Sequence, residues 1–217
     1  MNFEQARSNM IKQQICAWQI PDPDMKDCLF AVKRELFVPA RYRNLAFAQV
    51  QIPLGHDAVM LLPGVEGRMA NALHLKASDR VLEIGTGSGY MAALLAAQAR
   101  HVDSIEIVPE LAATARTNLA NAQVTNVAVE EGNGLDPAMI RDTFDAIVIS
   151  GSLAQLPQHL ITHLAAGGRM IAIVGTGVNM EVELMVRGSG ASCTTKSLFE
   201  TVAPPLQYGP RRGAFVL

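Results

Sequence analysis

The spacing of apolar residues changes near residue 80 of this chain. Before that point Met10, Ile11 and Ile15 recur at the three- to four-residue spacing of a helix with one buried face. The pattern predicts N-terminal helices over residues 4–18, 24–36 and 64–75. Residues 40–62 show no clear period, and we expect a loop with a short strand there.

After residue 80 short strand-like runs alternate with helical ones. The predicted strands are 80–84, 102–107, 126–130, 145–150 and 169–175, and the predicted helices are 89–99, 110–121, 136–141 and 157–164. Three further strands are expected at 181–187, 193–200 and 213–217. This alternation predicts an α/β fold with a mostly parallel sheet and helices on both faces. The simplest organisation is one domain over 1–217, with an N-terminal helical part (1–78) and a sheet (79–217).

Composition narrows the class of protein. The chain has 217 residues, of which 49% are hydrophobic and 18% charged, so a full core and no long disordered region are expected. Eighteen Lys and Arg against twenty Asp and Glu give a net charge of −2, and no basic face points to nucleic acid. No secretory leader is visible, and the longest stretch without Asp, Glu, Lys or Arg, 146–168, contains too many polar residues to cross a membrane. Three separated cysteines without a C-x-x-C pair favour reduced thiols, which predicts a cytoplasmic location.

A glycine-rich turn follows the first predicted strand of the sheet. Residues 83–89 read Glu-Ile-Gly-Thr-Gly-Ser-Gly, and a helix begins immediately afterwards. Glycines in such a turn permit positive φ and let a ligand approach the backbone, at the carboxyl end of a strand where open α/β sheets bind cofactors. The candidate cofactor-binding residues of the turn are Glu83, Gly85, Thr86, Gly87, Ser88 and Gly89.

Two later strand ends add to this site. Glu106 ends the second predicted strand about twenty residues after the turn, where a carboxylate accepts hydrogen bonds from both ribose hydroxyls of a nucleoside. Asn133 and Gly134 follow the third strand, where Asn133 is a candidate for pairing with an adenine edge, although a Gly-Asn-Gly turn explains it equally well. A dinucleotide motif would need a third glycine at position 90, which is Tyr90, so a nicotinamide cofactor is disfavoured.

Together these segments resemble the protein-L-isoaspartate O-methyltransferase family of class I S-adenosylmethionine-dependent methyltransferases. Residues 32–39 read Val-Lys-Arg-Glu-Leu-Phe-Val-Pro and residues 52–56 read Ile-Pro-Leu-Gly-His, two phrases more specific to that family than the glycine turn. Residues 144–148 and 204–206 extend the resemblance over nearly the whole chain. It implies a Rossmann-like seven-stranded sheet, S-adenosylmethionine as donor, S-adenosylhomocysteine as product, and isoaspartyl residues of damaged proteins or peptides as acceptors.

The chain departs from the family pattern in the acceptor loop. The family follows its I-P-x-G phrase with a polar Q-T-I-S-x-P segment, whereas residues 57–63 here read Asp-Ala-Val-Met-Leu-Leu-Pro. With Pro63 aligned, Val59 and Leu61 replace the Thr and the Ser, and Asp57 adds a negative charge near a carboxylate acceptor.

This departure leaves three functions open: isoaspartyl methylation with a modified loop, methylation of another acceptor such as a small molecule, and a silent cofactor-binding protein. The apolar residues that would shape a different acceptor pocket are Val59, Met60, Leu61 and Leu62. No catalytic residue is assigned. Ser152 lacks a nucleophile elbow, and no metal site is expected, because His159 and His163 have no acidic ligand between them.

Overall fold

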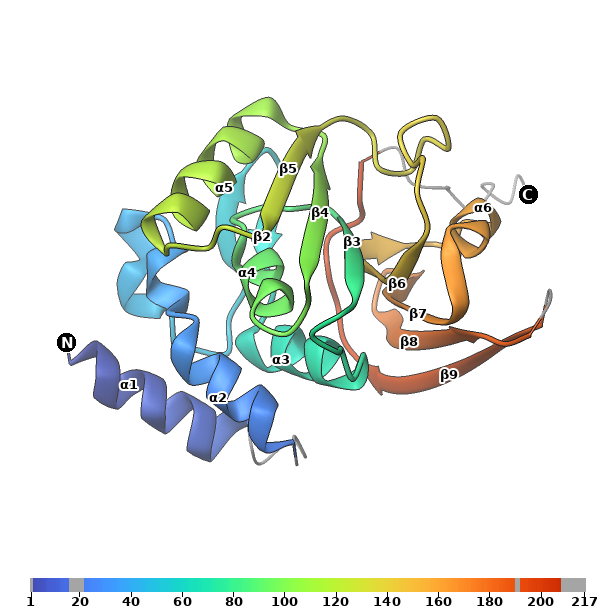
Figure 1. Cartoon of the computed structure of the whole chain (residues 1–217). Coiled ribbons are helices and arrows are strands. Elements are labelled where there is room, and N and C mark those ends of the chain that lie inside the picture. Colours follow the sequence, from blue (N-terminus) through green and yellow to red (C-terminus); the bar gives the residue numbers. More distant parts are fainter. Residues whose placement is uncertain (1, 16–21, 190–191, 208–217) are drawn as a thin grey trace, which may run out of the picture.

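A seven-stranded sheet forms the centre of the computed structural model, which describes residues 2–15, 22–189 and 192–207 (Figure 1). Its strands are β3 (Arg80–Ile84), β4 (His101–Glu106), β5 (Val127–Glu131), β6 (Phe144–Leu153), β7 (Leu164–Thr176), β8 (Asn179–Arg187) and β9 (Cys193–Glu200), in the order β5-β4-β3-β6-β7-β8-β9. The first five strands in this order are parallel, and β8 and β9 are antiparallel to their neighbours. The predicted fold class is therefore confirmed.

Each face of the sheet carries its own hydrophobic cluster. Alternate residues of a strand point to opposite faces, so Val81 belongs to one cluster and Leu82 to the other. The first face is covered by α3 (Pro63–Ala72), α4 (Tyr90–Ala96), α5 (Pro109–Asn121) and the N-terminal helices. The second face is covered by the short α6 (Gln158–Thr162) and by the turns around Leu135 and Ile140.

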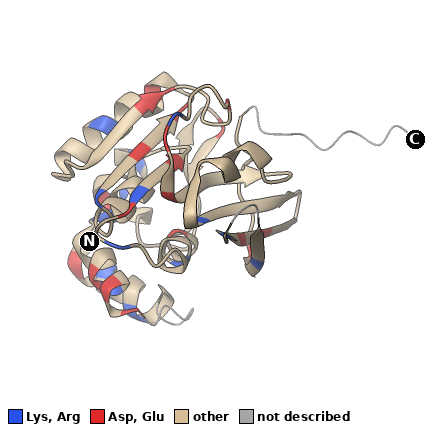
Figure 2. Cartoon of the chain, turned by 45° about the vertical axis from the view of Figure 1, so that its right-hand side comes forward, with Lys and Arg blue, Asp and Glu red and all other residues tan. Residues whose placement is uncertain are grey.

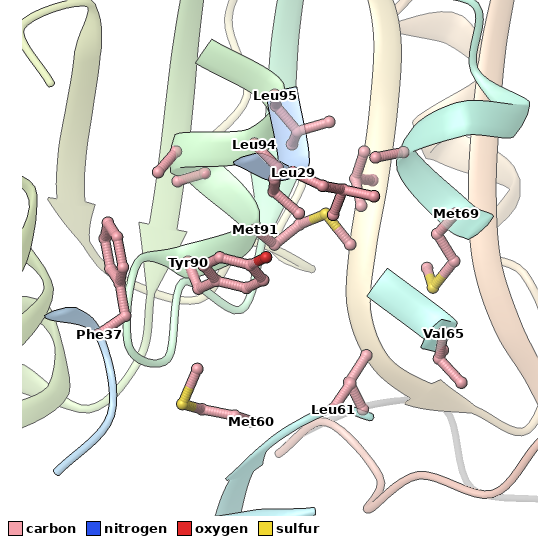
Figure 3. Packing of buried hydrophobic residues seen from close by; sticks show 14 of the residues in the cluster. Leu29, Phe37, Met60, Leu61, Val65, Met69, Tyr90, Met91, Leu94 and Leu95 are labelled. Atoms are coloured by element: carbon pink, nitrogen blue, oxygen red, sulfur yellow. The ribbon is translucent and has the colours of Figure 1, made fainter. Parts of the chain in front are cut away.

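The N-terminal part packs against the first face and shares its core. It comprises α1 (Phe3–Asn9), a π-helix (Met10–Ile15), α2 (Pro23–Ala31), two 3-10 helices (Arg34–Leu36 and Ala40–Leu45) and a hairpin of β1 (Ile52–Gly55) and β2 (Ala58–Met60). Figure 3 shows the buried residues of this region, with Tyr90 and Met91 of α4 lying between Phe37 and α3.

A buried arginine ties these segments together. The fully buried Arg34 forms an ion pair with Glu66 of α3, and it donates to the backbone oxygens of Ala46 at 3.0 Å and Leu61 at 2.7 Å. Its guanidinium also lies 4.7 Å from the centre of the Tyr90 ring, at the start of α4. Removing one partner of a buried ion pair costs about 3–5 kcal/mol of folding free energy. Through its contacts with Leu61, Glu66 and Tyr90, Arg34 therefore fixes the end of the hairpin against α3 and α4.

Several predicted boundaries were wrong. The predicted helix at 136–141 is a series of turns, because the side chains of Asn133 and Asp136 accept the backbone N–H groups of Leu135 and Ala138 and so compete with a helix. The helix predicted at 24–36 ends at Ala31, where the backbone becomes extended before a separate 3-10 turn.

Other predictions need smaller changes. β7 begins at residue 164, five residues before the predicted start, and the predicted helix at 157–164 is correspondingly shorter. The helix predicted over 4–18 is divided into an α-helix and a π-helix, and its last residues lie outside the described part of the chain. The strand predicted at 213–217 also lies outside the described residues.

Candidate cofactor and acceptor site

A cavity of about 880 Å³ opens at the carboxyl ends of the parallel strands. Residues at the ends of β3, β4, β6 and β7 form its floor, and the β1–β2 hairpin and the segment 204–207 form its walls. Such a volume is typical of a small-molecule or cofactor site, and this edge of the sheet is where α/β folds bind ligands.

The glycine turn between β3 and α4 forms part of the cavity floor. Gly85, Gly87 and Gly89 have φ values of +92°, +54° and +86°, a region that side chains rarely adopt. Gly85 and Gly87 line the cavity, whereas Gly89 begins α4 and packs against Ala115 and Leu119 of α5. The turn therefore places backbone, without side chains, directly beneath a ligand.

Glu106 lies where the turn meets the end of β4. One of its carboxylate oxygens accepts from the backbone N–H of Gly87 at 2.8 Å, and the other accepts from that of Val108 at 3.1 Å. These two bonds fix the orientation of a carboxylate that is 5% exposed and lines the cavity. Each oxygen retains a lone pair for a ligand hydroxyl, which suits the predicted ribose contact.

Glu83, Thr86 and Ser88 lie beneath the turn and are buried. The carboxyl oxygens of Glu83 accept from the hydroxyls of Ser104 at 2.6 Å and Ser150 at 2.9 Å, and the hydroxyl of Thr86 lies 2.6 Å from that of Ser104. Burial, with smaller contributions from the negative charges of Glu106 and Glu66, raises the pKa of Glu83 to about 8, although the two hydrogen bonds act to lower it. None of the three lines the main cavity, so their side chains support the turn from below.

Asn133 and Gly134 line the cavity beyond β5. The side-chain oxygen of Asn133 accepts from Leu135 N at 3.0 Å, which confirms a turn at this point and leaves its amide nitrogen for a ligand. A Cβ on Gly134 would lie 2.8 Å from Cγ2 of Ile84, so glycine is needed for the loop to approach the sheet. The contact of either residue with adenine stays a prediction.

Two segments far apart in sequence cover the turn. Leu54 of β1 lies over Gly87, with its Cδ1 3.2 Å from where a Cβ would stand, and Leu206 lies in the same way over Gly85 at 3.0 Å. The segments also bind each other, because Gln207 donates to the backbone oxygen of His56 at 3.3 Å. A second link runs from Gln51 to the backbone oxygen of Val202 at 2.6 Å. We call the part of the cavity between these two segments its acceptor end.

The acceptor end is largely apolar. Ala58, Val59 and Leu61 line it from the hairpin, whereas the buried Met60 and the half-buried Leu62 belong to the core and not to the cavity, contrary to the predicted pocket. Val59 and Leu61 also border a void of about 20 Å³ that faces Glu83 and Ser150.

Sequence reasoning did not identify several residues of this site. Ser150 had no motif of its own, and its hydroxyl donates to Glu83. Met180 of β8 also lines the cavity and had no sequence signal. Only the contact pattern of distant segments identifies Ser150 and Met180. Ser152, which the sequence analysis considered and set aside as a nucleophile, lines the cavity, and its hydroxyl donates to the backbone oxygen of Ala203 at 2.9 Å.

Charge and metal-ligating groups are sparse near the cavity. The described residues that line it include the acids Asp57 and Glu106 and no Lys or Arg, while Figure 2 shows acidic and basic residues interspersed over the rest of the chain. His163 binds the backbone oxygen of Asp142 at 3.0 Å, and the described residues contain no group of three or more metal-ligating side chains.

Within the same residues no helix is both long enough and apolar enough to span a bilayer.

Comparison with known proteins agrees with this architecture. The family model described as Protein-L-isoaspartate(D-aspartate) O-methyltransferase matches residues 5–207. A protein-L-isoaspartate O-methyltransferase of Methanoculleus marisnigri is 38% identical over 184 residues, which are 85% of this chain and 84% of that protein. A protein-L-isoaspartate O-methyltransferase 1 of Rhodopseudomonas palustris is 40% identical over 174 residues, 80% of this chain and 71% of that protein.

Among solved structures, one from Plasmodium falciparum superimposes with a TM-score of 0.79 over 95% of this chain and 99% of that one, at 19% identity. It is described as a protein-L-isoaspartate O-methyltransferase in complex with S-adenosyl-L-homocysteine. At that identity the likeness supports the fold, and the family assignment depends on the sequence relatives. The chain belongs to the protein-L-isoaspartate(D-aspartate) O-methyltransferase family.

Proposed function

We propose that this protein transfers a methyl group from S-adenosylmethionine to the carboxylate of L-isoaspartyl residues in damaged proteins or peptides, and releases S-adenosylhomocysteine. The observation that carries the proposal is the family match from residue 5 to residue 207, which includes both the glycine turn and the hairpin at the acceptor end. We also propose the cytoplasm as the compartment, in keeping with the separated cysteines.

The described residues fit this donor. Gly85 and Gly87 line the cavity with backbone in the left-handed region, and Glu106 presents an oriented carboxylate to two ribose hydroxyls. Asn133 has a free amide nitrogen for the adenine ring. When bound, the sulfonium donor supplies an electrophilic methyl group at the acceptor end of the cavity.

The chain's own contribution to the reaction is alignment and exclusion of water. An isoaspartyl carboxylate is already ionised at neutral pH, so attack in line with the methyl group needs no general base. Val59, Leu61 and Leu206 border the acceptor end with apolar surface, which removes water from the nucleophile. The hydroxyls of Ser150 and Ser152 already donate to Glu83 and to the backbone, so backbone N–H groups are left to orient the acceptor.

A direct assay tests the proposal. The protein is incubated with S-adenosylmethionine labelled in its methyl group and a peptide that contains one L-isoaspartyl residue, and base-labile methyl ester is measured. The same peptide with a normal aspartyl residue serves as control. Ester formation on the isoaspartyl peptide alone is expected, and its absence in a protein that binds the donor would refute the proposed acceptor.

A second acceptor class is favoured by the apolar lining. Val59, Leu61, Leu153 and Met180 border the cavity together, and none of them donates a hydrogen bond to a carboxylate. A small apolar acceptor would suit this surface. Donor turnover with small-molecule extracts, and none with isoaspartyl peptides, would support this second function over the first.

A further inference from the structure

Asp57 occupies the tip of the β1–β2 hairpin and lines the mouth of the cavity. Its side chain is exposed and forms no hydrogen bond or ion pair with any other described residue. Asp57 therefore places a negative charge without a described partner at the edge of the cavity.

The hairpin holds Asp57 in a fixed position. His56 and Asp57 have φ values of +53° and +59°, two consecutive left-handed residues that make the tight turn between β1 and β2. Leu54 packs over Gly87 on one side, and Gln207 binds the backbone oxygen of His56 on the other. The backbone at Asp57 is thus held beside the cofactor turn.

The charges around the acceptor are unbalanced. The other acid of the cavity, Glu106, has both oxygens bound to backbone N–H groups, and the described lining has no Lys or Arg to offset Asp57. The negative charge of Asp57 repels an isoaspartyl carboxylate that has no positive charge beside it. A basic residue beside the isoaspartate would instead lie against Asp57.

From this geometry we propose that Asp57 is a specificity-determining residue that selects isoaspartyl sites flanked by lysine or arginine and disfavours sites flanked by acidic residues. The inference rests on the proposed function. A unit charge about 7 Å from Asp57 in a solvated mouth changes binding about three- to fourfold, so replacing flanking lysine by glutamate should change kcat/KM roughly tenfold at low salt.

Three isoaspartyl peptides test the proposal, with Lys, Ala or Glu on either side of the isoaspartate. In the unmodified protein kcat/KM should be highest for the Lys peptide, lower for the Ala peptide and lowest for the Glu peptide. Adding 0.5 M KCl should reduce the differences in kcat/KM between the three peptides, because salt screens the charge of Asp57. The Asp57→Asn variant should reduce the spread to less than about twofold, because asparagine keeps the left-handed turn and removes the charge. The Glu4→Gln variant removes the charge of an exposed residue of α1, outside the cavity, and should retain the full spread.

The possible outcomes separate the two proposals. Equal turnover of the three peptides by the unmodified protein, or an unchanged spread in Asp57→Asn, overturns the role of Asp57 while the isoaspartyl activity stands. If no peptide is methylated although calorimetry shows donor binding, the proposed function fails and this inference fails with it.

Discussion

Replacing Glu106 tests whether its carboxylate binds the donor or only supports the glycine turn. The two substitutions of interest are Glu106→Ala, which removes both oxygens, and Glu106→Gln, which keeps the shape and one oxygen. In either variant at least one of the N–H groups of Gly87 and Val108 loses its acceptor. The perturbation therefore has a binding part and a folding part.

The two parts have different magnitudes. A hydrogen bond from a ribose hydroxyl to a carboxylate contributes about 1.5–3 kcal/mol, so the Ala variant should bind S-adenosylmethionine and S-adenosylhomocysteine about ten- to a hundredfold more weakly. An orphaned N–H at the edge of the cavity costs about 1–2 kcal/mol of stability, or about 2–8 °C in Tm for a chain of this size. The Gln variant should lie between the Ala variant and the unmodified protein in both measurements.

Isothermal titration calorimetry measures the binding part, and thermal unfolding without ligand measures the folding part. Glu131→Gln is the matched control, because Glu131 lies opposite Glu106 in the register of β4 and β5 and carries the same charge. Its side chain is exposed and bound to Arg116 at 2.8 Å, away from the turn. The control should keep the donor affinity of the unmodified protein.

One result would refute the reasoning about Glu106. If both Glu106 variants unfold at a lower temperature but keep the original Kd, the carboxylate only positions Gly87 and Val108 and does not bind the ribose. An equal loss of affinity in Glu131→Gln would instead assign the effect to the general negative potential at this edge of the sheet.

Two further variants test the interior of the site. Burial raises the pKa of Glu83 to about 8 from an ordinary 4.5, so the folded state keeps a proton that the unfolded chain releases. This contribution to stability is complete below about pH 4.5 and is lost at up to about 1.4 kcal/mol per pH unit as the pH rises to 8. Glu83→Gln should remove this fall in the free energy of unfolding with pH. If urea titrations show that the free energies of unfolding of the two proteins change in parallel with pH, the prediction is contradicted. Val59 and Leu61 border the void that faces Glu83 and Ser150, and the family pattern has a Thr and a Ser at these two positions. The double change Val59→Thr with Leu61→Ser should therefore raise turnover of an isoaspartyl peptide, because the added hydroxyls can orient its carboxylate. Donor binding with no gain in turnover would show that the missing hydroxyls do not limit the reaction.

The backbone geometry of the candidate cofactor site could be predicted from local sequence. A strand followed by alternate glycines and a helix determines a turn within about ten residues, and Glu106 ends the next strand of the same βαβ unit. The prediction failed where local signals competed, as at 136–141, where Asn133 and Asp136 bind the backbone and replace the expected helix with turns.

The acceptor half was decided by tertiary structure. The sequence showed that Val59 and Leu61 stand where the family has hydroxyls, but not that Leu206 lies over Gly85 or that Gln207 binds His56, 151 residues away. It also marked Arg34 only as part of a family phrase, whereas the fold makes it the buried link to Glu66. Such contacts depend on which segments meet when the two faces of the sheet are buried. Periodicity along the chain records which residues of an element are buried, but it does not record which distant segment covers them.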